Sequence, residues 1–472
     1  MINNHFHTIV IGAGSGGLTA AIGLARLGKN VALVEAGHVG GDCTNFGCVP
    51  SKTLIHLAKE FKPGSDPKDV LQEVIRKRDT LRDEKTKEVQ QVENLTFIRG
   101  LARFTGPKSL SVAYHDQTMA ISGDHIIIST GARPRLLTIP GLPPERTLTN
   151  ESLFDLAQTP DHLVIAGAGV IALEMAFAFH KLGTRVTLYA LDPLPLMTAI
   201  SEASEAMKSA LERAGIRAYF NAEAKDFDEN SQVLRLDQEG HIIEIQKVDQ
   251  VLIAIGRIRN LESLDLDKAG IQTDPRLGIL VNSYGETSVK GVYAIGDVTP
   301  TSAFTHSANA QGRRVVQRIA YPLLPLSKKE PLFPNATFSD PEVAAVGMTP
   351  QEMAGRFHPD LLRRIRVDFK TQTDRGYTDD IEEGFIILDV IRLTGRILHA
   401  TIVGPRASEM ISFFTLAISK KISLYRIFRL VYPYPTFSSG ILKAADIFMR
   451  ETLANFGKEL STYLRYRWAK PG

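Results

Sequence analysis

The chain has 472 residues, of which 44% are hydrophobic and 23% are charged, and its formal net charge is only +3. This length exceeds one ordinary hydrophobic core, so we expect roughly two to four domains of a soluble globular protein. The small net charge gives no electrostatic reason to expect nucleic acid or an acidic membrane as a partner, and no apolar run approaches the ~20 residues of a membrane span.

The N-terminal segment predicts a strand, a tight turn, a helix and a second strand. The strands are expected over Thr8–Ile11 and Asn30–Val34, with the helix between them ending near Gly28. The turn has G-x-G-x-x-G spacing, formed by Gly12, Gly14 and Gly17. These glycines allow the turn, the approach of a pyrophosphate to the backbone, and the packing of helix on strand, while the helix N-terminus offers free N–H groups. Glu35 closes the second strand and can accept hydrogen bonds from a ribose, so this segment predicts a dinucleotide site.

Both cysteines of the chain, Cys43 and Cys48, follow this unit at the start of a predicted helix. The N-terminus lacks a basic leader, so a cytoplasmic location is the simplest interpretation, and two cysteines there indicate catalysis, a metal site or no function. A C-x₄-C pair at a helix start can form a reducible disulfide, and Lys52 on the same helix can place a cation near the thiolate. A half zinc site lacks further cysteine ligands, and inert thiols stay open; we favour the redox-active disulfide and predict no metal site.

The glycine pattern recurs after a strand expected over His162–Ala166. Here the G-x-G-x-x-A variant is formed by Gly167, Gly169 and Ala172. Two such sites in one chain suggest a flavin and a nicotinamide cofactor, with a hydride passing between them. The next strand, Arg185–Tyr189, ends at Ala190, where an acidic residue would hold the ribose of NADH. No arginine follows directly to hold a 2′-phosphate, so NADPH is only slightly preferred and NADH stays open.

The stretch GGDCTNFGCVPSK (40–52) resembles the signature of the pyridine nucleotide-disulfide oxidoreductases, the family of dihydrolipoamide dehydrogenase, glutathione reductase and mercuric reductase. Further segments resemble those of the family in the same order: IIISTGARP (126–134), AIGRIRN (254–260), GVYAIGDV (291–298), THSANAQGR (305–313) and NATFSDPEVAAVGMT (335–349). The resemblance implies an α/β fold with two Rossmann-like domains, for FAD and NAD(P), plus a C-terminal α+β dimerisation domain. It also implies a homodimeric FAD enzyme.

On this basis we expect an FAD-binding domain over residues 1–150 and 271–330, an NAD(P)-binding domain over 151–270 and a dimerisation domain over 331–472. A Pro/Lys-rich linker, 321–336, precedes the last domain. That domain is expected to contain an antiparallel hairpin over 384–404 and an apolar, interface-type helix over 407–422. Residues 62–93 indicate a polar loop and a charged helix.

The resemblance also implies roles for single residues. Cys43 would be the thiol that exchanges with the substrate. Cys48 would lie nearest the flavin and form the charge-transfer complex with it. Lys52 would pair with Glu174, although a solvent-facing helix carboxylate is the alternative for Glu174. Asp297 would bind the ribityl chain, and the helix start at His306 would face the flavin pyrimidine. The expected FAD contacts are Gly12, Gly14, Gly17, Glu35, Gly41, Lys52, Thr130, Gly131, Asp297 and His306; those for NAD(P) are Gly167, Gly169, Ala172, Glu174 and Gly256.

The C-terminal segment departs from the family pattern. Thiol–disulfide members carry a histidine general base and an orienting glutamate where this chain has Tyr434 and Ser439. A phenol with a pKa near ~10 is a poor base at pH 7, and losing a general base costs about 10²- to 10⁴-fold. Dihydrolipoamide and glutathione are therefore not expected as efficient substrates. Mercuric reductase does not rely on that histidine, although its second cysteine pair is missing here. Tyr434 is a candidate site residue, and packing at the dimer interface is its alternative role.

The predicted function is an FAD-dependent NAD(P)H oxidoreductase with a redox-active Cys43–Cys48 disulfide. Its small-molecule electron acceptor would need no histidine base, as is true of metal ions, quinones and other small oxidants. Three alternatives stay open: a dihydrolipoamide dehydrogenase-like enzyme, a simple NAD(P)H oxidase or diaphorase, and a non-catalytic flavin-binding regulatory protein.

Overall fold

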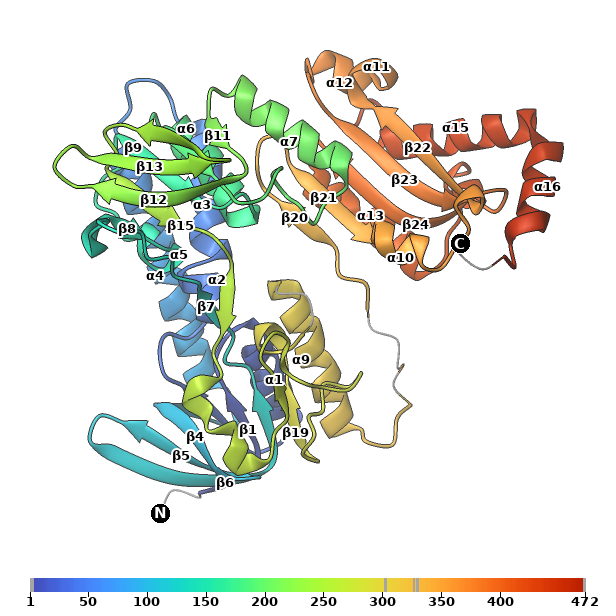
Figure 1. The fold of residues 1–472 in the computed structure, drawn as a ribbon. Coiled ribbons are helices and arrows are strands. Elements are labelled where there is room, and N and C mark those ends of the chain that lie inside the picture. Colours follow the sequence, from blue (N-terminus) through green and yellow to red (C-terminus); the bar gives the residue numbers. More distant parts are fainter. Residues whose placement is uncertain (1–3, 301–303, 326, 328–330, 470–472) are drawn as a thin grey trace.

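The structure is a computed structural model, which describes residues 4–300, 304–325, 327 and 331–469. Residues 326 and 328–330 of the expected linker therefore lie outside the described residues. Within these ranges the chain forms a seven-stranded sheet, two five-stranded sheets and several smaller ones, with helices packed against them (Figure 1). This architecture confirms the predicted α/β fold with two dinucleotide-binding units and a C-terminal α+β unit.

The first sheet contains the N-terminal glycine turn. Its strands, in order across the sheet, are β3 (Leu95–Arg99), β2 (Val31–Glu35), β1 (His5–Ile11), β6 (Gln117–Ile128), β5 (Ser109–Tyr114) and β4 (Leu101–Gly106), and β19 (Val292–Ala294) also pairs with β6. β1 pairs in parallel with β2 and β6, and its Ile9 and Val10 are fully buried. The crossover helix α1 (Ser15–Arg26) follows β1 directly, so its N-terminus lies at the carboxyl end of that strand. It buries Ala20, Ala21 and Leu24.

The second sheet repeats this arrangement around the second glycine turn. Its strands are β11 (Arg217–Tyr219), β10 (Arg185–Tyr189), β9 (His162–Ala166), β15 (Gln250–Ile253) and β8 (Thr147–Leu148), all parallel. The helices α6 (Val170–Lys181) and α7 (Ser201–Arg213) follow β9 and β10. β9 and β10 coincide with the predicted strands. The domain boundaries stay predictions, although β8 already belongs to this sheet before the expected boundary at residue 150.

Two short segments connect these sheets and lie side by side. β7 (Ala132–Pro134) leaves the first sheet and β16 (Arg257–Arg259) leaves the second, and they pair in antiparallel fashion. The pairing brings the segments 126–134 and 254–260 together, between the two glycine turns. A small sheet of β12 (Ala222–Asp228), β13 (Val233–Gln238) and β14 (His241–Ile245) covers the second unit.

The C-terminal sheet is antiparallel. Its strands are β20 (Asn335–Thr337), β21 (Val343–Gly347), β24 (Arg396–Val403), β23 (Phe385–Ile391) and β22 (Leu362–Asp368). β23 and β24 confirm the predicted hairpin, and α13 (Ala407–Ser419) confirms the apolar helix that follows it. α13 and α15 (Ser439–Ala454) bury Phe414 and Phe448 in this core, and α16 (Phe456–Tyr466) follows at the edge (Figure 1).

Shorter elements complete the chain. The remaining helices are α2 (Gly41–Asn45), α3 (Cys48–Glu60), α4 (Pro67–Gln91), α5 (Asn150–Leu153), α8 (Leu266–Ala269), α9 (Thr305–Ala320), α10 (Pro350–Ala354), α11 (Phe369–Gln372), α12 (Asp374–Thr378) and α14 (Leu424–Ile427). α4 is the charged helix expected within residues 62–93. No helix in the described part of the chain is long and apolar enough to cross a lipid bilayer.

Candidate active site

The first glycine turn joins β1 to α1 and leaves open space beside its middle glycine. Gly12 has a φ of 100°, and a Cβ there would lie 2.4 Å from the Ser129 carbonyl oxygen. A Cβ on Gly17 would lie 1.9 Å from the Gly12 oxygen, so this glycine allows α1 to pack on the turn. A Cβ on Gly14, by contrast, would meet no described atom within 4 Å, and Gly14 lines a cavity. This is the geometry of a backbone that a pyrophosphate approaches.

Glu35 ends β2 at the rim of the same cavity. One carboxylate oxygen accepts a hydrogen bond from the Ala13 N–H at 2.5 Å, and the other accepts one from the Gly37 N–H at 2.7 Å. These backbone bonds fix the carboxylate beside the turn, where a ribose hydroxyl would reach it. The position fits the ribose contact expected of Glu35.

The two cysteines lie on consecutive helices and are both free thiols in this structure. Cys43 is in α2, and Cys48 is the first residue of α3. A hydrogen bond from Cys43, with help from Thr305 and the positive charge of Lys52, lowers the pKa of Cys48 to about 6, although burial opposes this. That same hydrogen bond, together with burial, raises the pKa of Cys43. These opposite shifts favour the thiolate on Cys48 and the protonated thiol on Cys43.

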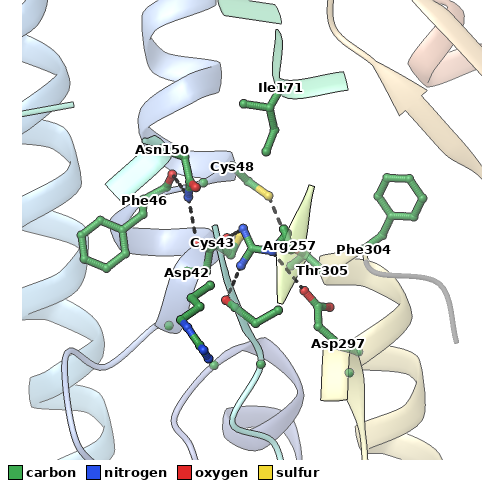
Figure 2. A pocket seen from close by; sticks show the side chains of 18 of the residues that line it. Asp42, Cys43, Phe46, Cys48, Asn150, Ile171, Arg257, Asp297, Phe304 and Thr305 are labelled. Carbon is green, nitrogen blue, oxygen red and sulfur yellow. Dashed lines mark hydrogen bonds and ion pairs between the residues drawn. The ribbon is translucent and has the colours of Figure 1, made fainter. Parts of the chain in front are cut away.

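The start of α9 faces Cys48, although it lies 257 residues further along the chain. The Oγ1 atom of Thr305 lies 3.2 Å from the Cys48 sulfur. Figure 2 marks this contact with a dashed line. The neighbouring His306 also lines the cavity, and its Nε2 atom lies 2.8 Å from the Pro334 carbonyl oxygen. The resemblance implies that the helix start at 305–313 faces the flavin. Nothing in the sequence near Thr305 or Cys48 predicts that the two side chains are in contact.

Lys52 and Glu174 form the ion pair that the resemblance implied. The Lys52 Nζ atom lies 2.7 Å from one Glu174 oxygen, and the other oxygen accepts a hydrogen bond from the Phe338 N–H at 3.0 Å. The Glu174 side chain is only 3% exposed, which rules out the solvent-facing alternative. Because α3 carries Lys52 and α6 carries Glu174, the pair ties the cysteine helix to the second unit.

The second glycine turn has the same form as the first. Gly167 has a φ of 117°, and a Cβ there would lie 2.4 Å from the Ala254 oxygen, whereas a Cβ on Gly169 would meet no described atom within 4 Å. Ala172 is buried in α6. Ala190 lines the cavity directly after β10, so an uncharged side chain stands where a ribose would lie. Gly256 also lines the cavity, with a φ of 114°.

One continuous cavity of about 2300 Å³ joins both glycine turns and both cysteines. Single-ligand pockets usually measure about 300–1,000 Å³, so this cavity is large enough for more than one ligand of that size. Thr130 and Gly131 also line it, and Gly131 has a φ of 69° with no described atom where a Cβ would lie. The open space beside Gly14 and Gly169 and the donor groups around it fit FAD and a nicotinamide dinucleotide.

Arg257 and Asp297 both line this cavity, and Figure 2 shows their side chains pointing toward one another. The Arg257 Nε atom lies 3.8 Å from an Asp297 oxygen; among the described residues it has no hydrogen-bond partner, although it is buried. Burial raises the pKa of Asp297, and the positive charge of Arg257 opposes this rise. A buried N–H without an acceptor indicates a missing ligand.

Tyr434 stands apart from these residues within the chain. Its side chain is exposed, and its hydroxyl donates a hydrogen bond of 2.6 Å to Asp374 on α12. This bond raises the pKa of the Tyr434 phenol. Ser439, which replaces the orienting glutamate, donates instead to the Thr436 carbonyl oxygen. The structure therefore brings the expected cavity residues together but not Tyr434.

A scan against protein families matches residues 6–312 to the pyridine nucleotide-disulphide oxidoreductases. Residues 333–445 match the dimerisation domain of the same family. Together these matches span most of the described chain, including both glycine turns, both cysteines and the C-terminal sheet.

Named relatives cover nearly the whole chain. Dihydrolipoyl dehydrogenase 3 of Haloarcula marismortui is 30% identical over 460 residues, which is 93% of this chain and 95% of the relative. A mercuric reductase of Shewanella putrefaciens is 30% identical over 483 residues, covering 97% of this chain and 83% of its own. Among solved structures, the Cu(II) complex of the HOCl-induced flavoprotein disulfide reductase RclA of Escherichia coli has a TM-score of 0.85. It is 26% identical and covers 94% of this chain and 99% of its own.

Proposed function

The chain belongs to the pyridine nucleotide-disulphide oxidoreductase family, whose enzymes use FAD and NAD(P)H, and from this premise we propose its electron path. Electrons pass from NAD(P)H through FAD to a Cys43–Cys48 disulfide and then to an acceptor that needs no histidine base. The observation that carries this proposal is the pair of thiols with opposite pKa shifts in a cavity shared by both glycine turns.

The surroundings of the pair support separate roles for the two sulfurs. Bound FAD would supply the two-electron chemistry that links the nicotinamide to the disulfide. Opening the disulfide with two electrons and one proton produces one thiolate and one thiol. Cys48 keeps the negative charge because Cys43, Thr305 and Lys52 lower its pKa, and Cys43 keeps the proton. Glu174 holds Lys52 in place for this task.

The C-terminal segment supports an acceptor that takes up no proton, because the Cys43 proton can leave to solvent when the disulfide re-forms. The Tyr434 hydroxyl donates to Asp374, and this bond raises the pKa of the phenol, so it carries no basic site at pH 7. A soft divalent metal ion binds thiolates directly and needs no base. The relatives named as a mercuric reductase and as a Cu(II) complex of RclA favour this class of substrate. We therefore propose a thiophilic metal ion as the acceptor, ahead of quinones and other small oxidants.

NADPH is preferred slightly over NADH, because Ala190 stands where an acid would hold the NADH ribose. The enzyme acts as a homodimer, which its match to the dimerisation-domain family supports. It works in the cytoplasm, where NAD(P)H is supplied and where paired cysteines are catalytic more often than structural.

The acceptor is tested by the rate of NADPH and NADH oxidation with Hg(II), Cu(II), a quinone and lipoamide. We expect oxidation to depend on the metal ion. Cys43→Ser should lose at least about 10²-fold of that rate, since removal of an enzyme's nucleophile is at least this costly. Fast lipoamide turnover would contradict the argument from the missing histidine. An unchanged rate in Cys43→Ser would instead favour the oxidase or diaphorase alternative.

A further inference from the structure

Asp42, which directly precedes Cys43, lies next to the first glycine turn. A Cβ on Gly41 would lie 2.7 Å from the Gly14 Cα, and the Gly40 N–H donates to the Ala13 carbonyl oxygen at 2.9 Å. The first turn of α2 therefore packs against the backbone that a pyrophosphate approaches. Asp42 lines the same cavity as Gly14, so its carboxylate stands beside the place where two further negative charges are to bind.

Arg257 reaches this carboxylate from the segment that leaves the second sheet. Its Nη1 atom lies 3.3 Å from an Asp42 oxygen, and its Nη2 atom donates to the Ala132 carbonyl oxygen at 2.5 Å. Its buried Nε atom has no hydrogen-bond partner among the described residues. A guanidinium offers parallel N–H groups that suit phosphate oxygens as well as carboxylates. Asp42 thus pairs with the guanidinium group of Arg257, which a pyrophosphate would also bind.

A buried amide fixes Asp42 in this position. The Asn150 Nδ2 atom lies 3.1 Å from the other Asp42 oxygen and 3.2 Å from the Phe46 carbonyl oxygen. Asn150 is only 6% exposed, so moving the carboxylate away would leave a buried amide less well satisfied. Asp42 therefore remains facing Arg257 when a ligand enters the cavity.

We propose that Asp42 competes with the FAD pyrophosphate for Arg257. Its carboxylate pairs with the guanidinium group as the phosphate would, and its negative charge repels the incoming pyrophosphate. FAD must share Arg257 with this carboxylate, so the protein binds its flavin less tightly than the same cavity would without the charge. The inference rests on the use of FAD, but not on the identity of the acceptor.

The test is calorimetric titration of the flavin-free protein with FAD. Asp42→Asn keeps an oxygen for Asn150 and removes the charge, so its Kd for FAD should be ~10-fold lower than that of the parent. Asp42→Glu keeps the charge and should not gain affinity. ADP, which contains the pyrophosphate, should show the same gain with Asp42→Asn, whereas riboflavin, which lacks phosphate, should show none.

Arg257→Met shows whether Asp42 acts through this cation. In that background the gain from Asp42→Asn should shrink, because repulsion remains but competition for the guanidinium is gone. Equal FAD affinity of the parent and Asp42→Asn, with intact folding by circular dichroism, would overturn the inference while leaving FAD binding in place. A gain with riboflavin equal to that with FAD would also overturn it. A parent protein that binds no FAD at all would overturn this inference and the proposed electron path together.

Discussion

Cys48 and Cys43 are the same residue type, and only their neighbours make them chemically different. Cys48 starts a helix, contacts Thr305 and lies near Lys52, whereas Cys43 donates a hydrogen bond to it. This asymmetry decides which sulfur carries the charge after reduction. Glu174, which is buried and forms an ion pair with Lys52, offsets the desolvation of the Lys52 ammonium group in the cavity.

The first prediction concerns the charge on Cys48. Its pKa is lowered to about 6, so the thiolate is present at pH 7 and is lost as the pH falls through about 6. The thiolate-to-flavin absorption band of the reduced enzyme should therefore disappear below this pH. Lys52→Met removes a charge that lowers this pKa, so the midpoint of the band should move to higher pH.

Lys59→Met is the matched control for this prediction. Lys59 lies on the same helix, but its side chain is 45% exposed and lies 3.9 Å from Glu342. Its replacement should leave the midpoint unchanged. The same midpoint in both variants would show that Lys52 does not stabilise the thiolate.

At the scale of elements, each glycine turn contains glycines of two kinds. One kind is needed for packing within the fold, and the other leaves space for the cofactor. Gly17 meets the backbone of its own turn, whereas Gly14 faces open space. Neighbouring glycines of one motif therefore have different physical reasons to lack a side chain.

The second prediction follows from this difference. Gly14→Val should leave the unfolding temperature of the flavin-free protein within a few degrees of the parent, yet weaken FAD binding by at least about tenfold, because its side chain fills the phosphate space. Gly17→Ala should lower the unfolding temperature, because its Cβ would lie 1.9 Å from the Gly12 oxygen. Thermal unfolding and a fluorescence titration with FAD measure the two effects. The reverse pattern would contradict the geometry of the turn.

The sequence predicts the turns, strands and helices that depend on interactions between neighbouring residues. The turn glycines, the β9 and β10 strands and the helix that starts at Cys48 follow from hydrophobic runs and fixed spacings, which act over few residues. Boundaries were less certain: the helix expected over 407–422 ends at Ser419, and Lys421 has a φ of 53°, outside the helical region.

Contacts between distant segments were not predictable in this way. Asp42 meets Arg257, Thr305 meets Cys48, and Tyr434 meets Asp374. Each pair depends on how separate elements pack against one another, and no local periodicity encodes that packing. The sequence predicts Cys48 and Tyr434 as site residues. It carries no local signal for their partners Thr305 and Asp374, or for the contact of Asp42 with Arg257.

At the scale of the whole molecule, the C-terminal unit leaves apolar side chains uncovered. On α13, Leu416 is 55% exposed, and Val431 further along the chain is 96% exposed. Exposed apolar groups of this kind are typical of surfaces that associate. Since residues 333–445 match a dimerisation domain, we expect these exposed side chains to take part in the contact between two copies.

The third prediction tests this contact. If the proposed homodimer forms through these side chains, Leu416→Glu should convert it to monomers in sedimentation velocity, because the variant places a charge at an apolar contact. Ile242→Glu, at a residue 47% exposed on β14, is the matched control and should stay dimeric. A dimer that survives Leu416→Glu would place the interface elsewhere.

The central claim is that the Cys43–Cys48 pair lies between the flavin and the acceptor. The most direct measurement is the absorption spectrum of the oxidised FAD enzyme during anaerobic titration with NADPH, compared with that of Cys48→Ser. The parent should develop a long-wavelength thiolate-to-flavin band while its main flavin absorption is largely retained, and Cys48→Ser should lack this band. Direct bleaching of the flavin by the first equivalent of NADPH, alike in both proteins and without the band, would contradict the account.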